Sequence, residues 1–186
     1  MAAPPDRSPV VSVVIPVCNE EENLRALYTC LTRVLGGGGK DYELVFVDDG
    51  STDNSRDVLQ AIAGQDSRVC LITLRTNVGK STALAAGFGQ ARGDIILTID
   101  ADLQDDPEDI SGFLTAIGGG ADLVSGWRKT RCDPRLKIGL SRIYNWVTRM
   151  VTGVPLHDFN CGLKAYRREL LTYLSKVQRD RIGGSR

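Results

Sequence analysis

The chain has 186 residues, a length that suits one globular domain and is too short for two full domains. Hydrophobic residues make up 42% of it, which is enough for a core. Nucleic-acid binding is not expected, because aromatic residues make up 6% of the chain and none alternates with Lys or Arg in a recognition pattern. The net charge is zero, but residues 1–126 carry 9 Lys/Arg and 19 Asp/Glu while residues 127–186 carry 14 and 4, which favours a metal-dependent reaction on phosphorylated substrates.

The chain opens with a polar, proline-rich stretch, residues 1–8, that we expect to be a disordered lead-in. The apolar residues 10–17 then predict a buried strand, which leaves the sheet at Pro16. A helix is predicted from Asn19 to about Leu35, where four consecutive glycines end it.

A second strand is predicted at residues 42–47, and it ends in the acidic sequence DDGSTD. Asp53 or Ser51 is able to cap the helix predicted for residues 54–63, so capping explains part of this acidic cluster. Capping does not explain why two acids directly follow the strand.

A third strand is predicted at residues 69–74 and a helix of small residues at 81–91, which should pack closely on the sheet. Between them, GKS at residues 79–81 suggests the phosphate-binding loop of an NTPase, but such a loop needs a glycine where Leu74 stands. We therefore expect no ATP hydrolysis. Lys80 is either a point-charge contact to a phosphate or an exposed loop lysine.

Residues 95–107, IILTIDADLQDDP, give the strongest functional signal. Their apolar residues predict a buried strand that ends in carboxylates. Buried charges are costly unless paired or bound to metal, so Asp100 and Asp102 indicate a hard divalent cation with oxygen ligands. In an extended chain, Asp102 and Gln104 point to the same side. The later acids are better explained as caps of the next helix; these are Asp105, Asp106, Glu108 and Asp109.

Strand and helix alternate four times before residue 110, and a further strand is predicted at 123–125. This order specifies the α/β class with a largely parallel central sheet. In such sheets ligands bind at the carboxyl ends of the strands. Candidate groups follow three of these ends, at residues 16–20, 48–49 and 100–104, and we expect them to converge on one site.

Five blocks in order resemble the family-2 glycosyltransferases of the GT-A fold: VVIPVCNEEENL, YELVFVDDGSTDNS, ARGDIILTIDADLQDDPEDI, DLVSGWRK and HDFNCGLKAYRREL. The most similar branch resembles the polyprenyl-phosphate glycosyltransferases, such as dolichyl-phosphate mannose synthase and undecaprenyl-phosphate sugar transferases. The resemblance spans about residues 9–172. It implies a GT-A (Rossmann-like) fold, a mostly parallel sheet flanked by helices, with a catalytic domain at residues 9–175.

The resemblance also implies the site residues. Those that bind the nucleotide sugar are Pro16, Cys18, Glu20, Val47, Asp49, Lys80, Asp100, Ala101, Asp102, Gln104 and Arg128. A tyrosine often stands at the position of Cys18 in the family. The D-A-D-x-Q stretch at residues 100–104 binds the diphosphate through Mg²⁺ or Mn²⁺, with Asp102 and Gln104 as the direct ligands.

The implied reaction is inverting transfer of a hexose from a GDP- or UDP-linked sugar to a polyprenyl phosphate. Arg128 grips phosphate oxygens as charge develops on the leaving group. Asp158 falls where related enzymes place an acid near the acceptor; its alternative role is a structural cap. Two other functions stay open: a nucleotide-sugar-binding remnant without turnover, and transfer to a hydroxyl acceptor, which needs a working base.

The basic part of the chain contains a predicted amphipathic helix at residues 135–151, with Arg135, Arg142 and Arg149 in one stripe and Trp146 beside it. It either packs on the sheet or lies on a membrane surface. Members of the resembled branch often continue into transmembrane helices, whereas this chain ends in a polar tail, residues 176–186, so we expect a truncated product.

Five cysteines, odd in number and without CxxC spacing, together with the lack of a signal peptide, indicate a reducing compartment. No apolar run approaches the ~18 residues that a membrane span needs. We therefore expect a cytoplasmic protein that is peripheral at the cytoplasmic face of a membrane. No feature of the sequence indicates an oligomeric state.

Overall fold

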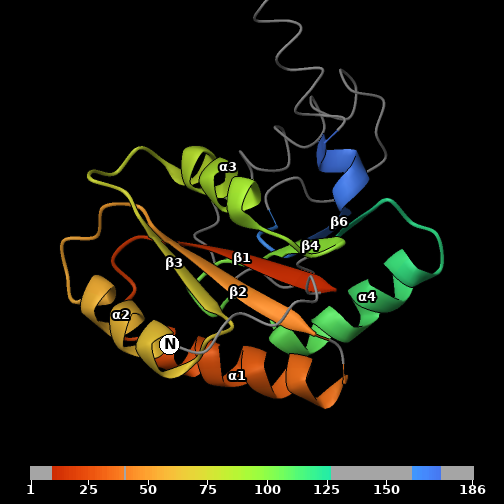
Figure 1. Ribbon diagram of the computed structural model, residues 1–186, viewed down its shortest axis with the longest axis horizontal. Coiled ribbons are helices and arrows are strands. Elements are labelled where there is room, and N and C mark those ends of the chain that lie inside the picture. The colour runs from red at the N-terminus through yellow and green to blue at the C-terminus, as the bar shows by residue number, and fades with distance from the viewer. Residues whose placement is uncertain (1–9, 40, 127–160, 173–186) are drawn as a thin grey trace, which may run out of the picture.

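The computed structural model describes residues 10–39, 41–126 and 161–172. Its centre is a six-stranded sheet in the order β3-β2-β1-β4-β6-β5 (Figure 1). The strands are β1 (Val11–Val17), β2 (Tyr42–Asp48), β3 (Val69–Thr73), β4 (Ile95–Thr98), β5 (Leu123–Ser125) and β6 (Lys164–Arg167). The helices are α1 (Leu24–Gly37), α2 (Ser55–Gln65), α3 (Lys80–Gln90) and α4 (Ile110–Gly118), the last preceded by a short 3-10 turn, η1 (Pro107–Asp109).

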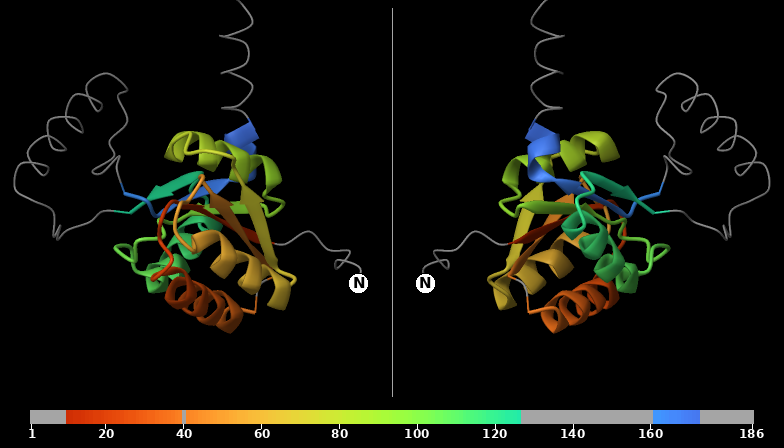
Figure 2. Two further views of the ribbon diagram at one scale, coloured as in Figure 1. Left: turned by 90° about the vertical axis from the view of Figure 1, so that its left-hand side faces the viewer. Right: turned by 90° about the vertical axis from the view of Figure 1, so that its right-hand side faces the viewer.

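Helices cover both faces of the sheet. α1, α2 and α4 lie on one face, and α3 lies on the other beside the short helix that begins at Arg168 (Figure 2). Alternate residues of a strand point to opposite faces, so Val13 and Ile15 of β1 join the core on the α1 side, whereas Val14 joins the core on the α3 side. The α/β class is confirmed.

α3 packs closely on the sheet, as its small residues predict. A Cβ at Gly87 would lie 2.3 Å from Cγ1 of Val14, so no larger residue fits there without movement of the helix. α3 is consequently held against β1 and β2, and its first residue, Lys80, lies near the edge where those strands end.

β1, β2, β3 and β4 are parallel, which confirms the predicted core of the sheet. β1 and β2 end together, with Val17 opposite Asp48, and β4 is in register with β1 as far as Thr98 opposite Val14. The residues that follow these three strands therefore leave the sheet at one edge, as expected for a ligand site.

β6 is the strand that the sequence pattern did not predict, and it runs antiparallel between β4 and β5. The guanidinium of Arg167 donates to the Ile117 carbonyl in the last turn of α4 (2.6 Å) and to the Ala121 carbonyl beyond it (3.2 Å), and that of Arg168 donates to two carbonyls just after α3 (both 2.8 Å). Carbonyls at a helix end lack partners within the helix. Arg167, the last residue of β6, and Arg168, the next residue, thus bind the C-terminal ends of helices on opposite faces of the sheet.

An ion pair with a buried carboxylate lies near the amino ends of the strands, away from the expected site. Glu43 of β2 is buried, accepts a 2.6 Å hydrogen bond from Ser12 of β1, and is bound by the Arg92 guanidinium at 2.7 and 2.9 Å. A buried carboxylate needs such partners. Glu43 therefore has a structural role.

Some predictions fall on residues that the structure does not describe: the lead-in 1–8, the helix at 135–151, Arg128, Asp158 and the tail 176–186. Within the described ranges, none of the helices has the length and apolar character that crossing a membrane requires.

Candidate active site

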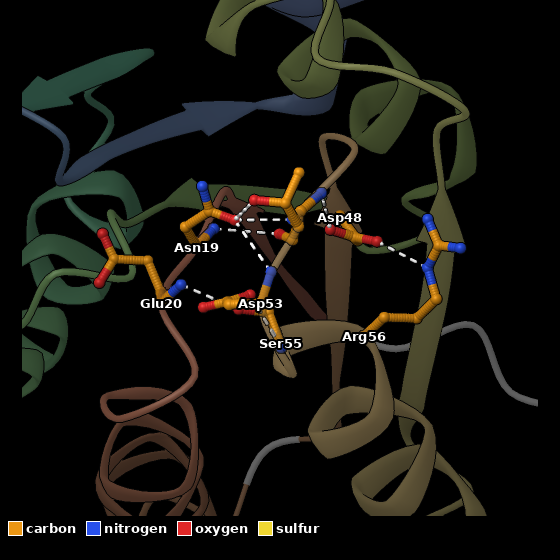
Figure 3. Close-up of polar contacts among 8 residues, drawn as sticks. Asn19, Glu20, Asp48, Asp53, Ser55 and Arg56 are labelled. Carbon is orange, nitrogen blue, oxygen red and sulfur yellow. Dashed lines mark hydrogen bonds and ion pairs between the residues drawn. The ribbon is translucent and has the colours of Figure 1, made fainter.

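The loops that follow β1 and β2 are tied to each other by hydrogen bonds (Figure 3). The Asn19 side chain accepts from the Thr52 N–H at 2.8 Å, the Asn19 N–H donates to Ser51 Oγ at 3.0 Å, and the Glu20 N–H donates to Ser55 Oγ at 2.9 Å. Asn19 has φ 57°, a left-handed conformation that asparagine tolerates better than most residues. Because Asn19 and Glu20 make these contacts between the loops, α1 begins at Leu24 and not near Asn19 as predicted.

The two acids at the end of β2 have different tasks. Asp48 is buried, and its carboxylate accepts from the Ser51 N–H at 3.0 Å and from Arg56 Nε at 3.1 Å (Figure 3). It therefore holds the turn that follows its own strand. The N-cap residue of α2 is Asn54 and not Asp53 or Ser51 as predicted, but the Asp53 carboxylate does accept from the Ser55 N–H at the start of that helix, at 3.0 Å.

Asp49 fixes the loop ahead of α3. One carboxylate oxygen accepts from the Val78 N–H and the other from the Gly79 N–H, each at 2.9 Å. The backbone donors that a phosphate-binding loop would turn towards a nucleotide are thus bound to a carboxylate, which adds a second reason, beside Leu74, to exclude that interpretation of GKS.

The acids after β4 lie in a turn and not in an extended chain. Leu103 has φ 57°, and the Asp102 carboxylate accepts from the Gln104 N–H at 3.1 Å. The expectation that Asp102 and Gln104 extend side by side from a strand is therefore wrong, because the backbone reverses between them. Asp106 caps η1 by accepting from the Glu108 N–H at 3.0 Å, as predicted for these later acids. Asp105 is instead buried, with Cys161 Sγ 3.6 Å from its carboxylate.

A cavity of about 300 Å³ lies where the three strand ends meet. The residues that line it are Pro16, Val17, Cys18, Glu20, Asp49, Asn77, Lys80, Asp100 and Asp102. Seven of these nine were predicted site residues. Val17 and Asn77 were not. Asn77 donates to Cys18 Sγ at 3.1 Å, and no motif in the sequence indicated that it belongs to the site.

Three other predicted residues do not line this cavity. Val47 and Ala101 are buried in the two cores of the sheet, and Gln104 is exposed. Arg128 and Asp158 lie outside the described residues.

Lys80 and Asp100 form an ion pair across the cavity. Lys80 Nζ lies 2.6 Å from one carboxylate oxygen of Asp100 and 2.8 Å from the other. The Lys80 side chain is 52% exposed and that of Asp100 19% exposed, so the pair is open to solvent on the lysine side. Lys80 was predicted either to contact phosphate or to be an exposed loop residue; the structure places it in the cavity wall.

The donor set fits a divalent cation that arrives with a diphosphate. In the described part of the chain, no group of three His, Cys, Asp or Glu side chains is arranged to hold a metal ion by itself. Two carboxylates, Asp100 and Asp102, nevertheless line the same cavity. Mg²⁺ is commonly held by one or two carboxylates together with substrate phosphates, so this pair has the composition expected of such a site.

Gly162, from the C-terminal HDFNCGLKAY block, lies against the acids of the site. A Cβ on this residue would lie 2.4 Å from Asp100 Oδ2 and 2.7 Å from Asp105 Oδ2, and its carbonyl accepts from Thr98 Oγ1 at 2.7 Å. The described part of this block, from Cys161 on, is therefore packed onto the strand that delivers the carboxylates.

Comparisons with known proteins agree with this arrangement. The sequence model of a family described as Glycosyl transferase family 2 matches residues 12–174. Undecaprenyl-phosphate 4-deoxy-4-formamido-L-arabinose transferases from Shewanella sediminis and Serratia proteamaculans are each 43% identical over 162 residues, which is 87% of this chain and 49% and 50% of theirs. The chain thus spans about half the length of the curated relatives it matches.

Solved structures with the same fold include glucosyl-3-phosphoglycerate synthase from Mycobacterium tuberculosis in complex with Mn²⁺, UDP-glucose and phosphoglyceric acid. It is 25% identical with a TM-score of 0.67, over 88% of this chain and 58% of that one. A mannosyltransferase from Pyrobaculum calidifontis in complex with GDP-Man and Mn²⁺ is 22% identical with a TM-score of 0.65, over 94% and 49%. These likenesses confirm the GT-A fold.

Proposed function

The chain belongs to glycosyl transferase family 2, and on this premise we propose that it moves a sugar from a GDP- or UDP-linked donor to a polyprenyl phosphate. The supporting observation is the cavity at the carboxyl ends of β1, β2 and β4, which Lys80, Asp100 and Asp102 line together. The acceptor class rests on the relatives, which are named for transfer to undecaprenyl phosphate.

The donor binds with its base and ribose against the loops after β1 and β2. Pro16, Cys18 and Glu20 come from the first loop and Asp49 from the second, and hydrogen bonds between the loops hold these positions. The diphosphate extends towards Asp100 and Asp102. Asp102 would hold Mg²⁺ or Mn²⁺, as the resemblance implies, and Asp100 lines the same cavity, whereas Gln104, the other expected ligand, does not. When bound, the cation supplies positive charge to the phosphate oxygens as negative charge develops on the leaving group.

In the reaction, an oxygen of the acceptor phosphate forms a bond to the anomeric carbon, and the bond from that carbon to the donor diphosphate breaks. The nucleoside diphosphate leaves with the electron pair. A phosphate monoester has a second pKa near ~6, so at neutral pH the acceptor is already an anion and needs little help from a base. Arg128, from the predicted phosphate-binding position, would add charge stabilisation at the leaving group.

We place the reaction at a membrane surface, because a polyprenyl phosphate stays in the bilayer, and at the cytoplasmic face, because the odd number and spacing of the cysteines indicate a reducing compartment. The basic part of the chain, residues 127–186, is suited to anionic headgroups.

The test is incubation with Mn²⁺, short polyprenyl phosphates and a panel of GDP- and UDP-linked sugars that includes hexoses and a 4-formamido-arabinose donor, followed by detection of lipid-linked sugar. Product formation that stops with EDTA is the expected result. Donor binding without product would indicate a remnant, and product formed only on hydroxyl acceptors would refute the proposed acceptor.

Binding of the donor should depend on metal through Asp102. In calorimetry, Asp102→Ala is expected to remove the metal-dependent part of nucleotide-sugar affinity, because the cation offsets the repulsion between carboxylate and diphosphate. Asp57→Ala, which removes an exposed acid on α2, is the control and should bind as the unmodified chain does. Equal affinity of the unmodified chain with and without EDTA would contradict the metal assignment.

A further inference from the structure

Two exposed apolar side chains flank the cavity. Among the described residues, the large hydrophobic side chains that are exposed belong to Val10, Val78 and Leu103, at 37%, 49% and 41%. Val10 precedes β1 and lies at the amino ends of the strands, away from the cavity. Val78 directly follows the lining residue Asn77, and Leu103 directly follows the lining residue Asp102. The cavity, which carboxylates and a lysine line, therefore has apolar side chains beside it on two of its loops.

The backbone holds both side chains in place. The Val78 N–H donates to the Asp49 carboxylate at 2.9 Å. Leu103 has φ 57° in the turn that the Gln104 N–H closes by donating to the Asp102 carboxylate. This left-handed conformation is unfavourable for leucine, and a side chain that stays 41% exposed offsets little of the cost by its own burial. The turn thus keeps a leucine exposed beside Asp102 at a cost, which points to a use for that side chain other than packing.

Resting on the function proposed above, we propose that Val78 and Leu103 form an apolar rim that binds the first isoprene units of the acceptor lipid. The acceptor phosphate has to enter the cavity to reach the sugar, and its prenyl chain is joined directly to that phosphate. The first isoprene units therefore lie at the edge of the cavity, where they leave the carboxylates and meet these two side chains. Contact with the rim removes apolar surface from water on both partners.

The size and the place of the rim favour a lipid chain over a larger partner. An isoprene unit is similar in size to the side chain of valine or leucine, so two such residues suffice for contact with one chain. A stable protein interface takes about 800 Å² from each partner, far more than two side chains expose. Attachment to a bilayer surface likewise uses a whole apolar helix face. The rim also adjoins the phosphate site itself, as the chain of the acceptor must.

The test compares phosphates with and without a prenyl chain. Phosphorus NMR titrations in the presence of Mg²⁺ and UDP or GDP measure the affinities of geranyl phosphate and methyl phosphate. We expect the unmodified chain to bind geranyl phosphate roughly tenfold more tightly, because each methylene group that leaves water contributes to binding. In the double variant Val78→Thr, Leu103→Asn, this ratio should fall to roughly twofold while the affinity for methyl phosphate is retained.

The substitutions are chosen to keep the fold. Both new side chains are close in size to those they replace, and asparagine tolerates the left-handed conformation at residue 103 better than leucine does. Retained affinity for methyl phosphate, together with an unchanged urea midpoint, shows that a lower ratio does not come from a disturbed site. The matched control is Val10→Thr, which makes the same change at an exposed valine away from the cavity and should leave the ratio at its full value.

The outcomes separate this proposal from the function on which it rests. If the double variant keeps the full ratio, the rim is refuted and the proposed acceptor stands. If it keeps the ratio but sediments less with vesicles that contain no polyprenyl phosphate, the two side chains contact the bilayer and not the acceptor. If the unmodified chain binds geranyl phosphate no more tightly than methyl phosphate and forms no lipid-linked sugar, the rim and the proposed acceptor are refuted together.

Discussion

Gly162→Ala tests how tightly the C-terminal block is packed on the acids of the site. The added Cβ would lie 2.4 Å from Cγ and Oδ2 of Asp100 and 2.7 Å from Oδ2 of Asp105. Ordinary contacts of this kind are about 3.5 Å or longer, so the overlap is about 1 Å. Either the start of β6 or the Asp100 carboxylate must move by that amount. Overpacking of this kind costs about 1–3 kcal/mol, and we expect a loss of stability in that range.

The same displacement should reach the proposed metal site, because Asp100 is one of the two carboxylates that line the cavity there. We expect Gly162→Ala to weaken Mn²⁺ binding, measured by calorimetry, in addition to lowering the midpoint of urea unfolding. The matched control is Gly112→Ala in α4, where a Cβ meets nothing within 4 Å. That substitution should stabilise the helix by about 0.5–1 kcal/mol and leave Mn²⁺ binding unchanged.

If Gly162→Ala unfolds at the same urea concentration as the unmodified chain and binds Mn²⁺ equally well, the close contact between the C-terminal block and Asp100 does not exist, and the reasoning fails.

Three further predictions concern the ion pair of Asp66, ATP hydrolysis and attachment to a membrane surface. The hydrogen bonds from the Arg68 guanidinium, partly opposed by desolvation, lower the pKa of Asp66. The lowered pKa contributes to the free energy of unfolding. This contribution is complete above the unfolded pKa of about 3.9 and is lost as pH falls through the lower folded pKa. Urea midpoints should therefore fall less on acidification in Asp66→Asn, and an identical acid profile would count against the pair. With Leu74 in place of the required glycine, no ATP hydrolysis is expected, and a rate of order ~1 s⁻¹ would overturn that conclusion. Sedimentation of the chain with vesicles should require anionic lipid and fade at high salt. It should also weaken when Arg142 and Arg149 become Glu, since each basic residue near such a surface contributes about 1 kcal/mol to binding. Binding that does not depend on lipid charge would refute the predicted membrane helix.

The parallel part of the sheet was predictable because each of its strands is a continuous apolar run followed by a turn signal. β5 was also located correctly at 123–125. β6 was not, because its sequence KAYR has no apolar run and its pairing with β4 joins residues far apart in the chain, such as Leu97 and Ala165. Local pattern carries no information about such a pairing.

The convergence of three strand ends on one cavity was predictable from topology, whereas the separate tasks of the acids were not. Asp48 and Asp49 are adjacent and chemically identical, yet one holds its own turn and the other holds the loop before α3. That difference depends on which backbone N–H groups a distant loop presents. The turn at Leu103, which separates Gln104 from the cavity, was not predictable either, because leucine rarely adopts a positive φ.

The order of strands in the sheet constrains how the chain can fold as it is synthesised. β5 is hydrogen-bonded to β6, which lies about forty residues later in the sequence, and β6 also completes the edge of β4. Until β6 has been made, β4 exposes an unpaired edge beside apolar residues such as Leu97, which is the kind of surface on which nascent chains associate wrongly. Pairing of β6 with β4 and β5 is thus the last step in assembling the sheet.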